Sequence, residues 1–185
     1  FLEVLTLTLF FLMASFGYRD RVKVAFVSLS WGIIGALLFL VAALMVYSQI
    51  QSLEVHALGE LAGNPLVVGI ISVFLLSLIM KLALFPFHVW MPSVHAEHPT
   101  CIAGLLAIYA NLALYIIIRV LILPLTADFE PFGLPLMFLA LVTMVYGSLL
   151  TLAQTDIKRL AACSTISQIA YSVLGIGALT VAGLE

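Results

Sequence analysis

The feature that most restricts the fold of this chain is a series of long, uninterrupted apolar runs. We count six of them: Phe1–Tyr18, Val22–Tyr47, Pro65–Pro92, Cys101–Leu123, Gly133–Ala153 and Leu160–Ala182. A helix needs about 20 apolar residues to cross the hydrocarbon core of a bilayer. Because the runs do not alternate between apolar and polar residues, the pattern does not favour membrane strands. It predicts an all-α integral membrane protein with six transmembrane helices.

Composition supports the same class of protein. Of the 185 residues, 64% are hydrophobic and 9% are charged, whereas soluble domains carry about 25% charged residues. The net charge of −2 gives no indication of nucleic-acid binding. The two cysteines, Cys101 and Cys163, lie in apolar runs, which favours packing roles over a disulfide or a metal site. Because the chain starts without Met inside an apolar run, we expect it to be a piece of a longer protein.

Charged residues between the runs predict the orientation. The loops after the second and fourth runs, residues 48–64 and 124–132, contain acidic residues but neither Lys nor Arg. Five of the seven Lys and Arg residues flank the loops after the first and fifth runs: Arg19, Arg21, Lys23, Lys158 and Arg159. Since Lys and Arg are enriched in cytoplasmic loops, we expect this basic side to face the cytoplasm.

Two of these basic residues stand in an unusual place. Thr155 or Asp156 is a suitable N-cap for the last helix, which puts Lys158 and Arg159 in its first turn. The helix dipole disfavours cations at that end. Orientation of the chain by positive charge and a specific partner for the cations are both open explanations.

The third run, Pro65–Pro92, is too long for one straight span. At about 1.5 Å per residue it would reach ~40 Å, against a hydrocarbon core of ~30 Å. Pro86 and Pro92 also lack the backbone N–H groups that a continuing helix requires. We therefore expect a helix that is interrupted between Lys81 and Pro92. Interrupted helices in membranes often line ion sites, where protein or water satisfies the free backbone groups.

Lys81 is expected inside the bilayer, ~24 Å along the third helix. A charge at that depth costs free energy and usually serves a function, although a structural ion pair is an alternative. Glu3 is the acidic residue that lies well inside an apolar run, so it is the candidate partner. His88 and His95 follow the interruption and suit a proton relay, with a purely structural role equally open. No cluster of ligands around these histidines indicates a metal site.

The segment KLALFPFHVWMPSVHAEHPT, residues 81–100, resembles the signature of the antiporter-like subunits of respiratory complex I and of Mrp-type cation/proton antiporters. QTDIKRLAACSTISQIAYSVLGIG, which starts at Gln154, resembles the second signature of that family. LEVLTLTLFFLMASFG resembles its fifth helix. The M-type branch, similar to mitochondrial subunit 4, is the most similar. The first signature is carried by Lys81, Pro86, His88, Trp90, Pro92, His95, Pro99 and Thr100.

The resemblance implies that residues 1–185 form a single proton-conducting membrane transporter domain. They would cover the fifth to the tenth of about fourteen helices in a larger antiporter-like bundle, with the third of the six discontinuous. It further implies that Glu3 and Lys81 are the pair that drives proton translocation. Because histidine titrates near neutrality, we expect protons to enter through water near His88 and His95.

The fourth run departs from the family pattern. Where the family has a lysine four residues before a tyrosine, this chain has Asn111, followed by Tyr115 and Arg119. Asparagine cannot exchange a proton, but it can hold water by hydrogen bonds. Asn111 and Tyr115 share a helix face, whereas Tyr109 is turned about 200° from Asn111. We therefore expect Asn111 and Tyr115 to continue the proton path, with helix packing as the alternative role of Asn111.

The sequence thus predicts a proton-translocating membrane subunit of an NADH:quinone oxidoreductase of the complex I type. Its expected partners are the other membrane subunits and the hydrophilic subunits of the complex, together with the lipid bilayer. The expected location is a prokaryotic cell membrane. Redox chemistry would take place in those partners, because this chain has no Rossmann-type glycine motif for a dinucleotide, no evident haem-ligand pair and no iron–sulfur cysteine pattern. Two alternatives remain: an Mrp-type Na⁺/H⁺ antiporter or membrane-hydrogenase subunit, and a structural scaffold that does not pump.

Overall fold

In the computed structural model, which describes residues 2–99 and 102–182, every regular element is a helix. The all-α prediction is therefore confirmed for these residues. The α-helices are α1 (Leu2–Phe16), α2 (Arg21–Ile50), α3 (Val67–Lys81), α4 (Trp90–Glu97), α5 (Ala103–Ile116), α6 (Thr126–Leu152) and α7 (Ile157–Val181). Shorter elements are the 3-10 helices η1 (Val55–Leu61) and η2 (Phe87–Val89) and the π-helix η4 (Ile117–Ile122), which continues α5.

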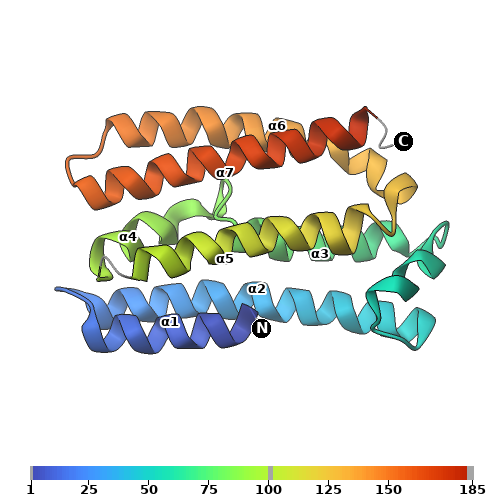
Figure 1. Ribbon diagram of the computed structural model, residues 1–185, viewed down its shortest axis with the longest axis horizontal. Helices are drawn as coiled ribbons and strands as arrows, with labels where there is room; N and C mark the ends of the chain where they lie inside the picture. The colour runs from blue at the N-terminus through green and yellow to red at the C-terminus, as the bar shows by residue number, and fades with distance from the viewer. Residues whose placement is uncertain (1, 100–101, 183–185) are drawn as a thin grey trace.

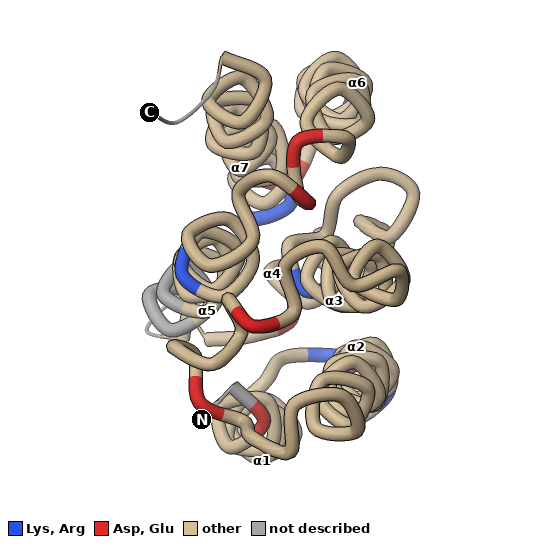
Figure 2. The backbone as a smooth tube through the Cα atoms, turned by 90° about the vertical axis from the view of Figure 1, so that its right-hand side faces the viewer, with Lys and Arg blue, Asp and Glu red and all other residues tan. Residues whose placement is uncertain are grey.

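The helices run side by side in three layers (Figures 1 and 2). One outer layer holds α1 and α2, and the other holds α6 packed on α7. The middle layer holds α3, α4 and α5 (Figure 1). The core between the layers is almost entirely apolar, and Lys81 and His98 are among its few buried polar side chains.

Three helices in the described part of the chain, α2, α6 and α7, are long and apolar enough to cross a membrane. Shorter apolar helices cover Glu3–Phe16, Val67–Lys81 and Tyr109–Ile122. Many large apolar side chains on the outer faces are exposed, such as Leu37, Phe138 and Leu149. A helix that is apolar on all sides is typical of a membrane span, so the chain is an integral, multi-pass membrane protein.

The third predicted helix is interrupted between α3 and α4. Ala83 has a φ of 54°, in the left-handed region, and the backbone N–H of Phe85 donates to Thr143 Oγ1 of α6 at 3.2 Å. Pro92, however, does not interrupt the second half, because it is the third residue of α4. In the first turn of a helix the N–H that proline lacks would be unpaired anyway.

The fifth predicted helix starts earlier than the sequence suggested. We expected a loop over residues 124–132 and a helix over Gly133–Ala153, but α6 begins at Thr126 and contains Pro131 and Pro135. Prolines bend a helix without ending it when neighbouring groups compensate, and the first turns of α6 lie at an angle to the rest (Figure 1). Asp128 in the first turn also suits the helix dipole.

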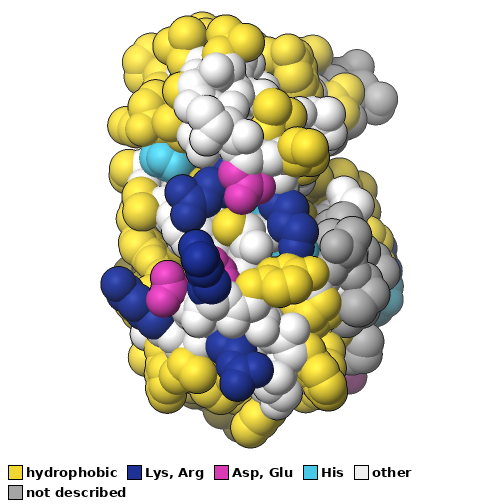
Figure 3. All heavy atoms as spheres, turned by 90° about the vertical axis from the view of Figure 1, so that its left-hand side faces the viewer, with side chains coloured by type: hydrophobic (Ala, Val, Ile, Leu, Met, Phe, Trp, Pro, Cys, Tyr) yellow, Lys and Arg dark blue, Asp and Glu magenta, His cyan; other side chains and the backbone are white. Residues whose placement is uncertain are grey.

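The two ends of the molecule differ in charge, in agreement with the alternating loops. Arg and Lys side chains gather at the end where α1 joins α2 and α6 joins α7 (Figure 3). The loop between α4 and α5 lies at the same end, since Tyr18 N donates to Glu97 O at 2.9 Å. At the other end, Gly63 N donates to Asp128 Oδ2 at 3.2 Å. That the basic end is cytoplasmic stays a prediction.

Candidate functional site

The candidate site is centred on Lys81, at the point where α3 ends. The Lys81 side chain is 1% exposed, and its Nζ lies 2.5 Å from Glu3 Oε1. The Glu3 side chain is 46% exposed and borders an open groove of about 760 Å³ between α1, α2 and α5. The two residues that the sequence singled out are therefore in direct contact, and theirs is the one ion pair in residues 2–99 and 102–182.

The helix arrangement brings this pair to the middle of the molecule. The first turn of α1 lies beside the middle of α2, not at its end (Figure 1). Glycines on α2 then allow close approach: a Cβ at Gly35 would lie 3.3 Å from Lys81 Cγ, and a Cβ at Gly32 would lie 2.4 Å from Thr6 Cγ2. Small residues at these two positions let α1 and α3 lie directly against the α2 backbone.

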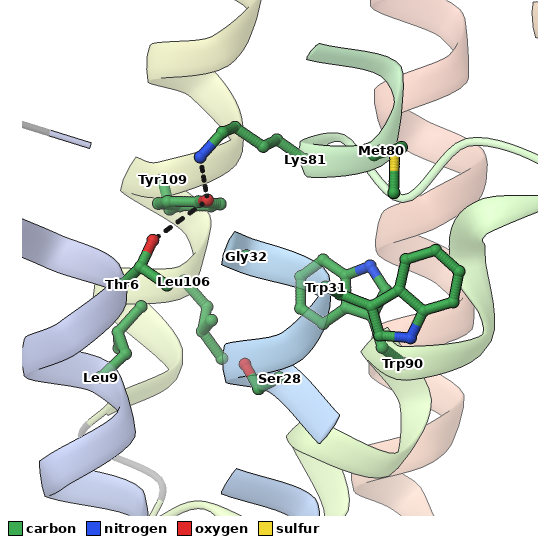
Figure 4. A pocket seen from close by; sticks show the side chains of 10 residues that line it. All are labelled: Thr6, Leu9, Ser28, Trp31, Gly32, Met80, Lys81, Trp90, Leu106 and Tyr109. Atoms are coloured by element: carbon green, nitrogen blue, oxygen red, sulfur yellow. Dashed lines mark hydrogen bonds between the residues drawn. The ribbon is translucent and has the colours of Figure 1, made fainter. Parts of the chain in front are cut away.

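Tyr109 of α5 is the second oxygen partner of the lysine (Figure 4). Lys81 Nζ donates to Tyr109 OH at 3.2 Å, and the ring centroid is 5.6 Å from Nζ. The same hydroxyl lies 3.4 Å from Thr6 Oγ1, one turn beyond Glu3 on α1. The ammonium group thus contacts one charged oxygen and one neutral oxygen, and the neutral one links it back to α1.

A small cavity of about 20 Å³ adjoins this group, lined in part by Ser28, Trp90 and Tyr109 (Figure 4). A water molecule needs on the order of 10–15 Å³ of such space and two to four polar partners. Within the described residues, the buried Trp90 Nε1 has no hydrogen-bond partner. The cavity therefore has the size and the polar lining for one water molecule beside Lys81.

Of the two histidines that the sequence singled out, His88 lies within the interruption, in η2, and His95 lies beyond it, on α4. Neither ring makes a hydrogen bond to Lys81 in the described part of the chain. His88 is buried, stacks on Phe85 at 5.9 Å between ring centroids and meets the Tyr146 ring edge-on at 4.9 Å. His95 Nδ1 bonds with Met91 O at 3.0 Å, and its ring centroid is 5.1 Å from that of His98. Each ring is thus held in place, whereas a role in proton transfer stays a prediction.

His98 lies in the loop after α4 and is 2% exposed. Burial lowers the pKa of His98 below its usual value, the hydrogen bond of its Nδ1 with Pro99 O opposes this effect, and the positive charge of Lys158 lowers the pKa further. The ring is therefore neutral at pH 7, although its buried Nε2 has no partner in residues 2–99 and 102–182.

Asn111 and Tyr115 face away from the site. Asn111 is exposed and Tyr115 is 58% exposed, whereas Tyr109 is only 6% exposed. The turn of about 200° between Tyr109 and Asn111 is the reason: the face that carries Tyr109 meets Lys81, so the other face points outward. Among the described tyrosines, Tyr109 is thus the one that contacts Lys81, whereas the sequence favoured Tyr115 for the proton path. Whether Asn111 and Tyr115 carry protons stays a prediction.

The sequence pattern did not mark Tyr109 as an inward-facing residue. The buried positions of this helix follow helical spacing: Leu106, Tyr109, Ala110, Ala113 and Ile117. In the sequence this stripe is hidden, because nearly every residue of the run is apolar.

The predicted packing role of the cysteines can be compared with the structure only for Cys163, which is buried and free. Thr100 and Cys101 lie outside the described residues. No group of three or more His, Cys, Asp or Glu side chains that could hold a metal occurs in the described ranges.

Comparison with known proteins places the whole chain in one family. The family described as NADH:quinone oxidoreductase/Mrp antiporter, TM, matches residues 1–185. The NADH-ubiquinone oxidoreductase chain 4 of Mycosarcoma maydis is 34% identical over 189 residues, and subunit M of the NADH-quinone oxidoreductase of Rickettsia bellii is 30% identical over 190. Both matches cover 100% of this chain, which spans 39% and 38% of the respective relatives.

Solved structures share the fold. A chain of respiratory complex I from Thermus thermophilus superposes with a TM-score of 0.82 at 23% identity, covering 95% of this chain and 38% of that one. A chain of the Mrp complex from Dietzia sp. DQ12-45-1b gives 0.84 at 19% identity, covering 95% and 34%. With its entire length matched, this chain belongs to the NADH:quinone oxidoreductase/Mrp antiporter membrane family and is a homologue of complex I subunit M or chain 4.

Proposed function

We propose that the chain is part of a proton-translocating membrane subunit of a complex I-type NADH:quinone oxidoreductase. The observation that carries the proposal is the buried Lys81, held by Glu3 and Tyr109 where a helix is interrupted. Ionisable groups buried within a membrane bundle mark ion and proton pathways. We further infer that α1, α3 with α4, and α5 with η4 also cross the bilayer, as part of a bundle of about fourteen helices.

The proposed mechanism is a displacement of charge. With the Glu3 carboxylate in contact, the Lys81 ammonium is stabilised at its buried position. When the carboxylate moves away or takes up a proton, the ammonium keeps only the neutral Tyr109 hydroxyl. Its N–H bond then breaks, the proton passes to a water molecule that would occupy the adjoining cavity, and the electron pair stays on Nζ as a neutral amine. A proton from the opposite side restores the ammonium.

The partners follow from the same proposal. Proton translocation at this site requires energy from electron transfer, which belongs to hydrophilic subunits that bind NADH and pass electrons to quinone. Neighbouring antiporter-like membrane subunits would respond to the charge displacement at this site with their own buried charged residues. We infer a prokaryotic cell membrane, with the basic end of the molecule in the cytoplasm.

One observation favours a second candidate, an Mrp-type cation/proton antiporter subunit: the fold matches the Dietzia Mrp complex as well as it matches complex I. The energy source separates the two candidates. In inverted membrane vesicles, NADH-driven proton uptake supports the first function, and proton release driven by a sodium gradient alone supports the second.

The test uses the full-length protein in its assembled complex. Lys81→Met should abolish the proton uptake that depends on this subunit, because the amine that exchanges the proton is gone. Lys81→Arg should also impair it, since a guanidinium group keeps the ion pair but hardly deprotonates. Lys23→Met is the matched control, because Lys23 is exposed at the basic end. Normal proton uptake per electron in an assembled Lys81→Met complex would refute the proposed function.

A further inference from the structure

The position of Lys158 at the start of α7 has a structural explanation that the site above does not use. Asp156 caps α7, since its Oδ1 accepts the backbone N–H groups of Lys158 at 2.8 Å and Arg159 at 3.4 Å. Asp156 is one of the two caps that the sequence suggested. The cap places both cations at the positive end of the α7 dipole, where a cation is disfavoured.

The Lys158 side chain leaves its own helix and reaches α4. Its Nζ donates to the backbone carbonyl of His98 at 3.1 Å and lies 4.1 Å from the centroid of the Tyr18 ring. His98 is the C-cap residue of α4. The ammonium group therefore sits at the negative end of the α4 dipole, where a cation is favoured, and over an aromatic face that also attracts it.

Helix α4 needs support of this kind. It has eight residues, and helices this short are marginal without tertiary contacts. Its last carbonyls have no partner within the helix. Besides the bond from Lys158, Tyr18 N donates to Glu97 O at 2.9 Å and Asp20 N donates to Glu97 Oε2 at 3.1 Å. Groups from two other parts of the chain thus cap the C-terminal end of α4.

Residues 17–20, 97–99 and 156–158 form one hydrogen-bonded cluster at the basic end, which we name the basic-end clamp. Gly17 permits the close approach, because a Cβ there would lie 3.1 Å from Glu97 O. The clamp joins the end of α1 and the start of α7 to the free end of α4. Of these, α1 carries Glu3, α7 packs on α6, and α4 is the second half of the interrupted helix.

We propose that Lys158 is a positioning residue that caps α4 from outside and holds it in register with α1. This rests on the proposed function, because the group positioned is Trp90 of α4, which lines the cavity beside Lys81. With the clamp open, only the packing of α4 on α2 and α7 holds this helix, so Trp90 encloses the cavity beside Lys81 less firmly. Lys158 touches neither Lys81 nor Glu3, so it acts on the site only through α4.

Arg159 provides a matched control. It is the next residue, carries the same charge and is exposed, and its side chain makes no hydrogen bond or ion pair within the described ranges. If positive charge at this end serves only to orient the chain, Lys158→Gln and Arg159→Gln should have equal effects. If the clamp is the function of Lys158, only Lys158→Gln should have one.

The experiment measures amide hydrogen exchange over residues 90–99 in the full-length protein within its complex, and proton uptake per electron in the same preparations. Lys158→Gln should raise exchange of α4 about tenfold and lower proton uptake, because a favourable charge and a cap are lost. Arg159→Gln should leave both unchanged. Lys158→Arg, which retains a cation long enough to reach His98 O, should restore most of the protection.

A milder variant keeps the test informative where Lys158→Gln fails to assemble. Tyr18→Leu removes only the aromatic face and should raise exchange over residues 90–99 less, whereas Tyr18→Phe should leave it unchanged. Unaltered exchange in Lys158→Gln, or equal exchange in the two Gln variants, would overturn the clamp. Exchange does not depend on pumping, so selective loosening of α4 in a complex that moves no protons would contradict the proposed function and leave the clamp supported.

Discussion

At the scale of single residues, the arrangement around Lys81 gives its ammonium group two partners of different kinds. Glu3 is charged and partly exposed, and Tyr109 is neutral and buried. Because the Tyr109 hydroxyl is held by Thr6, it stays in place when the carboxylate moves. An ammonium group in a bilayer that loses every partner is very costly. The tyrosine therefore allows the ion pair to separate without leaving the lysine uncompensated.

Tyr109→Phe tests this role, since it removes the hydroxyl and keeps the ring. A hydrogen bond to a charged group contributes about 1.5–3 kcal/mol. We therefore expect the rate of proton uptake by an assembled complex to fall by about tenfold or more. Tyr115→Phe is the control, because Tyr115 is 58% exposed and faces outward. Equal losses in the two variants, or a loss in Tyr115→Phe alone, would return the proton path to the outer face of α5.

At the scale of secondary structure, the interruption between α3 and α4 depends on a different helix. Phe85 N–H would be unpaired in an apolar environment without Thr143 Oγ1, which also donates to Leu139 O in its own helix at 2.7 Å. Thr143 is fully buried. A short chain segment that lacks its own helical hydrogen bonds is thus completed by α6, as backbone within a membrane requires.

Thr143→Val should destabilise this segment, because it keeps the shape of the side chain and removes the acceptor for Phe85 N. A buried donor left unpaired costs about 1–3 kcal/mol, which should appear as a lower midpoint of thermal unfolding of the purified complex. Thr165→Val is matched to it: Thr165 is only partly buried, and its hydroxyl donates to Ala161 O of its own helix. A midpoint lowered as much by Thr165→Val as by Thr143→Val would exclude the support from α6.

At the scale of the whole molecule, charge is divided between the two ends. The segments that follow α1, α4 and α6 meet at the basic end through the clamp. The 48–64 loop contacts the start of α6 at the opposite end of the molecule. Loops that are separated by an even number of spans lie on the same side of the membrane. The basic loops here share one end, as the positive-inside rule requires.

The orientation can be measured with single cysteines and a maleimide that does not cross membranes. Lys23→Cys at the basic end should react in inverted vesicles and not in right-side-out vesicles, and Glu60→Cys at the acidic end should show the reverse. The parent protein, with its own cysteines, sets the background. Reaction of both positions from the same side would contradict the six-span arrangement, and reversed labelling would place the basic end outside.

Much of the architecture could be predicted from the sequence, because it depends on features that are local in the chain. Apolar runs of membrane length indicated the helices, and Pro86 after Lys81 indicated the interruption, whereas Pro92 lies inside α4. Glu3 and Lys81 stood out because a charge inside an apolar run is rare and needs a partner. Each of these inferences follows from the cost of placing one group in hydrocarbon, which neighbouring residues alone determine.

Only the tertiary structure decided which helix faces meet. Tyr109 became a partner of Lys81, and Lys158 became a cap of α4, through contacts between residues that are 28 and 60 positions apart. In a soluble protein the apolar stripe of a helix reveals its inward face. A membrane helix is apolar towards lipid as well as towards its neighbours, so the rotation of each helix depends on close packing and polar contacts, which the sequence pattern does not display.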